Sequence, residues 1–274
     1  MSTATASVTA PAEPAAPVSH SRVGWAVTDA LTITWRNLLT LTRLPQLLVF
    51  ATIQPILFVL MFRYVFGGAI TVPGVDYVNF LMPGIFVQTV VFGATTTGVG
   101  LAEDLGKGII ERFRSLPMAR SAVLAGRSVA DLVRNFFVVV LMCIVGFLVG
   151  FRPSTSVIAF LGGVVLLLLL GFALSWLFAI VGLSVRTAES AQAATFPLTV
   201  PLVFASTAFV PLASMPGWLQ AWAEHQPVTI TVNAVRALMI GGPTSTLVAQ
   251  SLAWSLGMVA VFAPIAVRRY RRTA

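Results

Sequence analysis

The chain has 274 residues, of which 57% are hydrophobic and only 9% are charged, whereas soluble domains carry about a quarter charged residues. This composition excludes an ordinary soluble protein and indicates an integral membrane protein. The formal net charge of +8 does not indicate nucleic-acid binding, because the basic residues lie between apolar runs rather than on a soluble face. The single cysteine, Cys143, excludes a disulfide within the chain and metal sites built from cysteine pairs.

The first 45 residues contain two different segments. Residues 1–24 are rich in Ala, Pro, Ser and Thr and lack the basic start and apolar core of a secretory signal, so we expect a disordered, uncleaved cytoplasmic tail. Residues 25–45 place Leu31, Trp35 and Leu38 at helical spacing among polar residues. This pattern favours an amphipathic helix in the membrane interface over a soluble lead-in to the first span.

The remaining chain, 46–267, predicts an all-α membrane domain with six transmembrane helices. A span needs about 20 apolar residues, and six runs meet or approach that length: 46–66, 79–101, 130–150, 157–183, 193–212 and 247–267. Four glycines in the second run are more typical of close helix packing than of a substrate-lining face; they are Gly84, Gly93, Gly98 and Gly100.

The distribution of Arg and Lys predicts the orientation of these spans. With the N-terminus inside, fourteen of the 17 basic residues fall on the cytoplasmic side, and only Arg63, Arg152 and Arg236 fall outside. The basic tail at 268–274 anchors the C-terminus on the cytoplasmic side as well, so both termini are expected there. The outer segment 213–246 is too apolar for a solvated loop, and 228–240 has the length of a short helix. We therefore expect short re-entrant helices that pack on protein before the last span.

One loop, 102–120, holds seven of the chain's 26 charged side chains between two apolar runs. It contains no catalytic constellation and is interpreted as a docking surface at the cytoplasmic face. Within it, residues 106–116 predict a helix of about two to three turns that Pro117 ends.

Polar side chains inside spans are candidates for function, because they are costly in a membrane. Gln54 and Gln88, together with Thr95 and Thr96, are candidates for a substrate path; for the two glutamines, hydrogen bonding between helices is an equally good interpretation. Asp131 and Arg134 are three residues apart, and their spacing favours an ion pair within one helix over a proton relay.

Several kinds of site are absent from the sequence. There is no GxxxxGK[ST] phosphate loop, no HExxH metal box and no pair of carboxylates placed for ion coupling. The chain is therefore expected to have no catalytic residues, no metal site and no enzymatic activity of its own. Active transport would need a partner that supplies the energy.

Several segments taken in order resemble the membrane-spanning permease of daunorubicin- and doxorubicin-resistance-type ABC exporters, the type-two ABC transporter permease family. The resemblance covers about residues 30–268. The more specific pieces are DLGKGIIERFRSLPMAR at 104–120 and MPGWLQAW at 215–222; weaker ones are MFRYVFGGA at 61–69, YVNFLMPGI at 77–85 and AVRALM at 234–239.

The resemblance implies a multi-pass subunit of a bacterial cell membrane that exports amphiphilic drug-like or lipid-like compounds. It implies two copies of a separate ATPase that carry ATP and Mg²⁺, a second permease that is identical or a paralogue, and no nucleic-acid partner. It also implies that the interfacial helix and the 102–120 loop contact the ATPase. The coupling residues implied in this way are Glu103, Asp104, Lys107, Gly108, Glu111, Arg112, Arg114, Ser115 and Pro117.

Two other functions remain open from the sequence. An ion-coupled secondary transporter would need a titratable group at mid-membrane, and Asp131 lies near the inner end of its span. A membrane scaffold that transports nothing would not stimulate any partner ATPase in response to a substrate.

Overall fold

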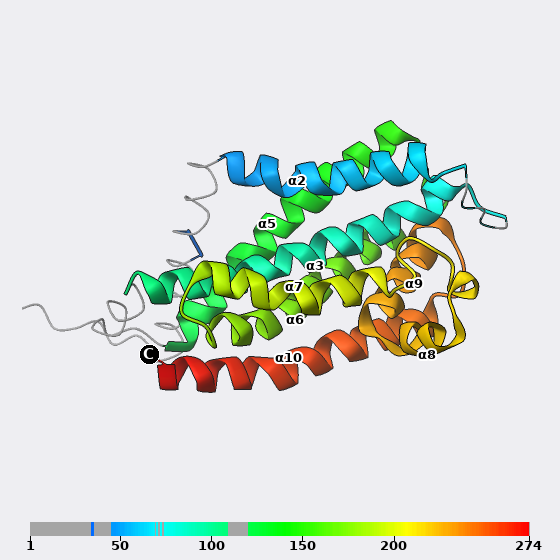
Figure 1. Ribbon diagram of the computed structural model, residues 1–274. Helices are drawn as coiled ribbons and strands as arrows, with labels where there is room; N and C mark the ends of the chain where they lie inside the picture. Colours follow the sequence, from blue (N-terminus) through cyan, green and yellow to red (C-terminus); the bar gives the residue numbers. More distant parts are fainter. Residues whose placement is uncertain are drawn as a thin grey trace, which may run out of the picture.

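The computed structural model describes residues 34–35, 45–68, 70, 72, 74–108 and 120–273. All regular secondary structure within these ranges is helical. The long helices lie side by side as a bundle, with the short helices α8 and α9 at one end and the C-terminus at the other (Figure 1). The elements are α2 (Pro45–Leu60) with η1 (Met61–Val65), α3 (Tyr77–Gly106), α5 (Arg120–Val149), α6 (Val157–Gly182), α7 (Ala188–Phe204), η2 (Leu212–Ser214), α8 (Gly217–His225), α9 (Pro227–Ile240) and α10 (Ser245–Thr273).

Four helices in the described part of the chain are long and apolar enough to cross a membrane, namely α3, α5, α6 and α10. The predicted first span forms α2, and the π-helical turn η1 continues it to Val65. Helix α7 has 17 residues, which at 1.5 Å per residue is about 26 Å, slightly short of a hydrocarbon core of about 30 Å. The all-helical class predicted from the sequence is thus confirmed for the described residues, while the count of six spans stays a prediction.

Helix α3 lies at the centre of the bundle and packs most extensively on α6. Small residues make this contact possible. A Cβ atom added at Gly98 would lie 2.4 Å from the carbonyl oxygen of Phe178, and one added at Gly182 would lie 2.1 Å from the carbonyl oxygen of Gly98. Gly84 meets the backbone of Ala208 in the same way. The glycines of the second run therefore serve helix packing at these positions, as their composition indicates.

The predicted fifth span differs from the observed helix at both ends. Helix α7 begins at Ala188, five residues before the predicted start at 193, because the Thr187 side chain accepts a hydrogen bond from the Ser190 amide and caps the helix. It ends at Phe204 rather than at 212. Two carbonyls beyond that end have side-chain donors from the following segment: Gln226 Nε2 donates to Ala205 O, and Arg236 Nη2 donates to Thr207 O.

The segment before α10 is folded against the bundle. Helix α9 covers the stretch 228–240 in which a short helix is predicted, and it packs on α6, α10 and α3. Most of its apolar side chains are buried, including Val228, Val232 and Met239. Whether α8 and α9 dip into an outer leaflet stays a prediction.

Two predicted features lie largely outside the described residues. Only Thr34 and Trp35 of the predicted interfacial helix are described; both are helical, and Thr34 Oγ1 donates a hydrogen bond of 2.9 Å to Gly126 O near the start of α5. In the 102–120 loop the described residues end at Gly108 and resume at Arg120. The loop residues outside the description are 109–119, among them Glu111, Arg112, Arg114, Ser115 and Pro117.

Candidate functional site

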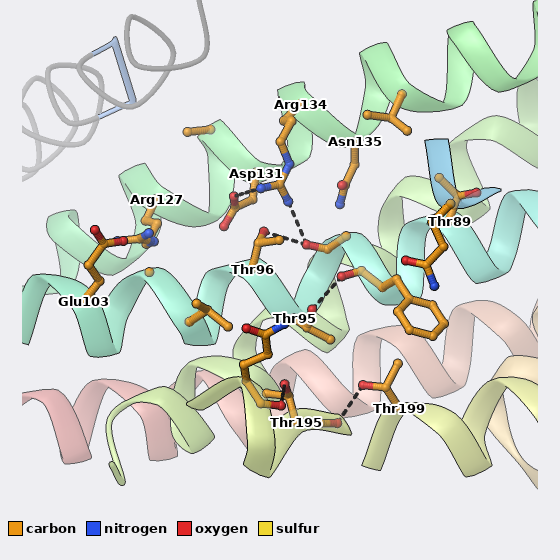
Figure 2. Close-up of a pocket in the computed structure, with 18 of the residues that line it drawn as sticks. Thr89, Thr95, Thr96, Glu103, Arg127, Asp131, Arg134, Asn135, Thr195 and Thr199 are labelled. Atoms are coloured by element: carbon orange, nitrogen blue, oxygen red, sulfur yellow. Dashed lines mark hydrogen bonds and ion pairs between the residues drawn. The ribbon is translucent and has the colours of Figure 1, made fainter. Parts of the chain in front are cut away.

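A cavity of about 920 Å³ lies between α2, α3, α5 and α7 (Figure 2). Its volume is within the range of about 300–1,000 Å³ that small-molecule sites occupy. It extends along α3 from Gln88 to Lys107, which is more than five helical turns. We name the end of the bundle near Lys107 and the C-terminus of α10 the basic end, because Arg268, Arg269, Arg271 and Arg272 lie there. The opposite end is the α8–α9 end.

All four residues predicted for a substrate path line this cavity. Gln54 comes from α2, and Gln88, Thr95 and Thr96 come from α3. Glu103, Asp104 and Lys107, which were assigned to the coupling loop, line the same cavity at the basic end. One space therefore adjoins both sets of residues. Their transport and coupling roles stay predictions.

The threonine hydroxyls in the wall share one arrangement, in which each donates its proton to a backbone carbonyl of its own helix. On α3, Thr89 donates to Ile85 O at 2.7 Å, and Thr95 and Thr96 make the same kind of bond. On α7, Thr195 and Thr199 donate to Gln192 O and Thr195 O. Because a hydroxyl has one proton and two acceptor lone pairs, these five side chains retain acceptor capacity only.

Gln88 is the most buried amide of the wall. Its side chain is 1% exposed, and its Oε1 atom has no hydrogen-bond partner among the described residues. A buried polar atom without a partner costs roughly 1–3 kcal/mol, so this oxygen is a plausible contact for a bound group. Interhelical hydrogen bonding, the other interpretation of Gln88 from the sequence, is not made by Oε1 in this structure.

Charged residues line the cavity toward the basic end, and each cation there faces a carboxylate. Arg127 on α5 pairs with Asp104 on α3, with both side chains 18% exposed. Arg134 Nη1 lies 3.3 Å from Asp131 Oδ1 within α5, which confirms the ion pair predicted from their spacing. Asp131 also accepts a hydrogen bond from Thr97 on α3, and Arg134 Nη2 donates to Gly93 O at 2.7 Å. Figure 2 shows Arg127, Asp131 and Arg134 in the space between α3 and α5.

Lys107 and Glu103 form an exposed pair one turn apart at the end of α3. The hydrogen bond and the negative charge of Glu103 raise the pKa of Lys107, which keeps the ammonium charged. Exposed pairs of this kind contribute little to stability, because solvent screens the two charges. The Lys107–Glu103 pair is therefore of interest for its position, because it lies where α3 ends within the 102–120 loop.

Two contacts between α3 and α5 toward the basic end were not predicted from the sequence, namely Arg127 with Asp104 and Thr97 with Asp131. The first pair could have been recognised from its charges. Asp104 and Arg127 have opposite charges and lie at the adjoining ends of two consecutive spans, which places them near each other once the helices pair. On α7, Gln192, Thr195, Phe196 and Thr199 follow the spacing i, i+3, i+4, i+7 of a single helix face. That pattern was available from the sequence and identifies the third wall of the cavity.

A second polar cluster, centred on Arg236, lies outside the cavity at the α8–α9 end. The guanidinium donates to Phe80 O from Nε and Nη2 at 3.2 and 3.1 Å, to Thr207 O at 2.9 Å and to Asn233 Oδ1 at 2.9 Å. Its central carbon also lies 3.7 Å from the centroid of the Phe80 ring. One side chain thereby joins α3, the turn after α7 and α9, so Arg236 has a structural role.

Comparison with known proteins places these features in a family context. The family model for ABC-2 type transporters matches residues 28–240. A daunorubicin resistance ABC transporter permease protein of Streptomyces coeruleorubidus is 36% identical over 246 residues, which cover 90% of this chain and 87% of the relative. A probable doxorubicin resistance ABC transporter permease protein of Mycobacterium tuberculosis is 30% identical over 227 residues, covering 82% of this chain and 81% of the relative.

Proposed function

The chain belongs to the ABC-2 type transporter family, and on this premise we propose that it is the permease subunit of an ATP-driven exporter of amphiphilic compounds. Two of its relatives are permease proteins named for resistance to daunorubicin and doxorubicin. The observation that carries the proposal is the cavity between α2, α3, α5 and α7, which adjoins both the predicted substrate path and the start of the 102–120 loop.

The cavity suits an amphiphilic cargo because its wall changes in character along its length. Apolar side chains such as Phe92, Val138 and Phe196 line it together with threonine hydroxyls, and charged pairs occupy the basic end. The lining acids Glu103, Asp104 and Asp131 balance the bases Lys107, Arg127 and Arg134, so the wall has no net formal charge. An apolar body with a polar head fits such a wall.

In the proposed topology, six helices cross the membrane, and both termini are cytoplasmic. The helices α2 with η1, α3, α5, α6, α7 and α10 alternate in direction along the bundle, which supports this count (Figure 1). The basic residues support the orientation. By the bounds of the helices, Lys107 follows α3, Arg127 lies in the first turns of α5, Arg186 lies between α6 and α7, and four arginines lie in the last turns of α10, which places them at the basic end. The residues toward the other end are Arg63 in η1, Arg152 after α5 and Arg236 in α9.

Two ATPase subunits, which carry ATP and Mg²⁺, are proposed to dock at the basic end of two permease subunits, either identical or paralogous. The 102–120 loop connects α3 directly to α5, and these helices form two walls of the cavity. A displacement of the loop by the ATPase therefore reaches the cavity through both walls. In this scheme the permease performs no chemistry and changes only the side from which the cavity is open.

The proposal is tested by reconstituting the full chain with a candidate ABC ATPase subunit in lipid vesicles. We expect ATP-dependent accumulation of doxorubicin, the compound in the name of one relative, measured by its fluorescence. A Walker-lysine variant of the ATPase is the control and should abolish accumulation. Accumulation that continues without ATP but stops when the proton gradient is dissipated would instead support an ion-coupled transporter.

A double substitution in the loop, Glu111→Ala with Arg114→Ala, is expected to uncouple the two subunits. The charges proposed to contact the ATPase are removed without any change to the spans, so ATP hydrolysis should continue while transport falls at least about tenfold. The measurement is the ratio of cargo moved to ATP hydrolysed. Substitution of Glu224 by alanine in α8, at the opposite end, is the control, and an unchanged ratio in the double variant would refute the assignment of the loop.

A further inference from the structure

The threonine hydroxyls in the middle of the cavity are hydrogen-bond acceptors whose own protons are already engaged. Thr89, Thr95 and Thr96 on α3 and Thr195 and Thr199 on α7 each donate to a carbonyl within their own helix. Their oxygens can therefore accept a further hydrogen bond but cannot donate one without breaking the existing bond.

Gln88 adds a buried acceptor oxygen that has no hydrogen-bond partner among the described residues. Its Oε1 is fully buried and unpaired among the described residues, and its side chain lines the same cavity. The amides of Gln54, Asn135 and Gln192 also line it, but none of their atoms is both fully buried and unpaired in the described part of the chain. Gln88 Oε1 has no access to water in this conformation. A bound molecule whose donor meets this oxygen after rotation of the amide gains a bond that the empty site lacks.

The charged donors of the cavity are concentrated elsewhere, at the basic end. The guanidinium groups of Arg127 and Arg134 and the ammonium of Lys107 each lie within ion-pair distance of a carboxylate. The Nε atom of Arg127 lacks a partner among the described residues, but it belongs to a group that Asp104 already neutralises. Along the middle of the described wall, a purely anionic cargo thus finds no unpaired cation and no free hydroxyl proton, and only amide N–H groups could donate to it.

We propose that this site selects amphiphiles bearing N–H or O–H donors, and that Gln88 Oε1 is the specificity-determining acceptor. The inference rests on the proposed export function for its biological meaning, but the binding preference is a property of the cavity alone. Sites built to pair a donor discriminate strongly against analogues that lack it, because the protein group is then left buried and unpaired.

The test uses two fluorescent cations with one scaffold, rhodamine 123 and tetramethylrhodamine methyl ester. They share charge and methyl ester, but four N-methyl groups remove every N–H donor from the second. Binding of each to the full chain in lipid nanodiscs is measured by fluorescence anisotropy, with empty nanodiscs subtracted. We expect rhodamine 123 to bind about tenfold more tightly.

The Gln88→Met variant should weaken rhodamine 123 binding about tenfold and leave the tetramethyl dye nearly unchanged, which also shows that the cavity is folded. Gln226→Met is the matched control. Gln226 is likewise buried with an unpaired Oε1, but it lies outside the cavity at the α8–α9 end. This control should keep the tenfold preference.

Three outcomes overturn the inference: equal affinity of the two dyes for the unaltered chain, a preference that survives in Gln88→Met, or no binding of either dye. The export function is judged separately, from ATP-dependent movement of the same dyes in vesicles that contain the ATPase. Equal binding with ATP-dependent movement refutes only the selectivity. A preference in binding without ATP-dependent movement supports the selectivity and refutes the export function.

Discussion

Replacing Gly98 by alanine is expected to lower the thermal unfolding midpoint of the protein by about 5 °C or more. In an exposed helix the same change is favourable, because alanine exceeds glycine in helix propensity by about 1 kcal/mol. Here the added methyl group would lie 2.4 Å from the carbonyl oxygen of Phe178. Since that oxygen belongs to the backbone of α6, only a separation of the two helices can relieve the overlap.

The single cysteine provides the measurement. Cys143 is buried in α5, so a thiol-reactive dye reports the temperature at which the bundle opens. Gly257→Ala is the matched control, because Gly257 is also helical and an added Cβ there meets nothing within 4 Å. The control should match or exceed the unaltered protein. If both variants shift alike, the close approach of α3 and α6 does not limit stability.

Reversing the charge of Arg127 to aspartate is expected to reduce transport at least about tenfold. The substitution places a second carboxylate against Asp104 in a partly buried site, where breaking an ion pair costs more than the 0–1 kcal/mol typical of exposed pairs. The two helices that flank the 102–120 loop should then separate at the basic end. Motion of the loop would no longer reach both walls of the cavity in step.

The double variant Asp104→Arg with Arg127→Asp restores an opposite pair and is expected to recover transport to within about threefold of the unaltered protein. Arg63→Asp is the control at the α8–α9 end, where Arg63 and Asp76 form a more exposed pair at 3.6 Å. Transport and ATP hydrolysis are measured together for all four proteins. Failure of the double variant to recover, with its unfolding midpoint unchanged, would show that the individual charges matter rather than their pairing.

Local sequence patterns were sufficient to predict most of the helices. The apolar runs at 79–101, 157–183 and 247–267 lie within or nearly within α3, α6 and α10, because continuous apolar length is a strong signal. The end of α7 could not be obtained in this way. The chain there, from Ala205 to Val210, is as apolar as a span, and its carbonyls at Ala205 and Thr207 bond to Gln226 and Arg236, which are 21 and 29 residues away.

The candidate site shows the same division between local and long-range information. Gln54, Gln88, Thr95 and Thr96 were identified one residue at a time, because a polar group inside an apolar run is conspicuous. The fact that they share one cavity with Asp131 and Thr199 depends on how four helices pack. The state of the threonine protons likewise depends on side-chain rotation, which residue type alone does not determine.

The contacts at the two ends of the bundle differ in kind, and this difference predicts where movement occurs. At the α8–α9 end, Arg236 joins three segments through bonds to backbone oxygens. Because these acceptors belong to the backbone, a change of side-chain rotamer in Phe80 or Thr207 does not remove them. At the basic end, α3 and α5 are held by the ion pair between Arg127 and Asp104 and by the hydrogen bond from Thr97 to Asp131. These contacts join side chain to side chain, so they can lengthen or exchange with water. The structure therefore predicts that the helices keep their relative positions at the α8–α9 end and separate more easily at the basic end. Such a separation would widen the cavity most at the basic end.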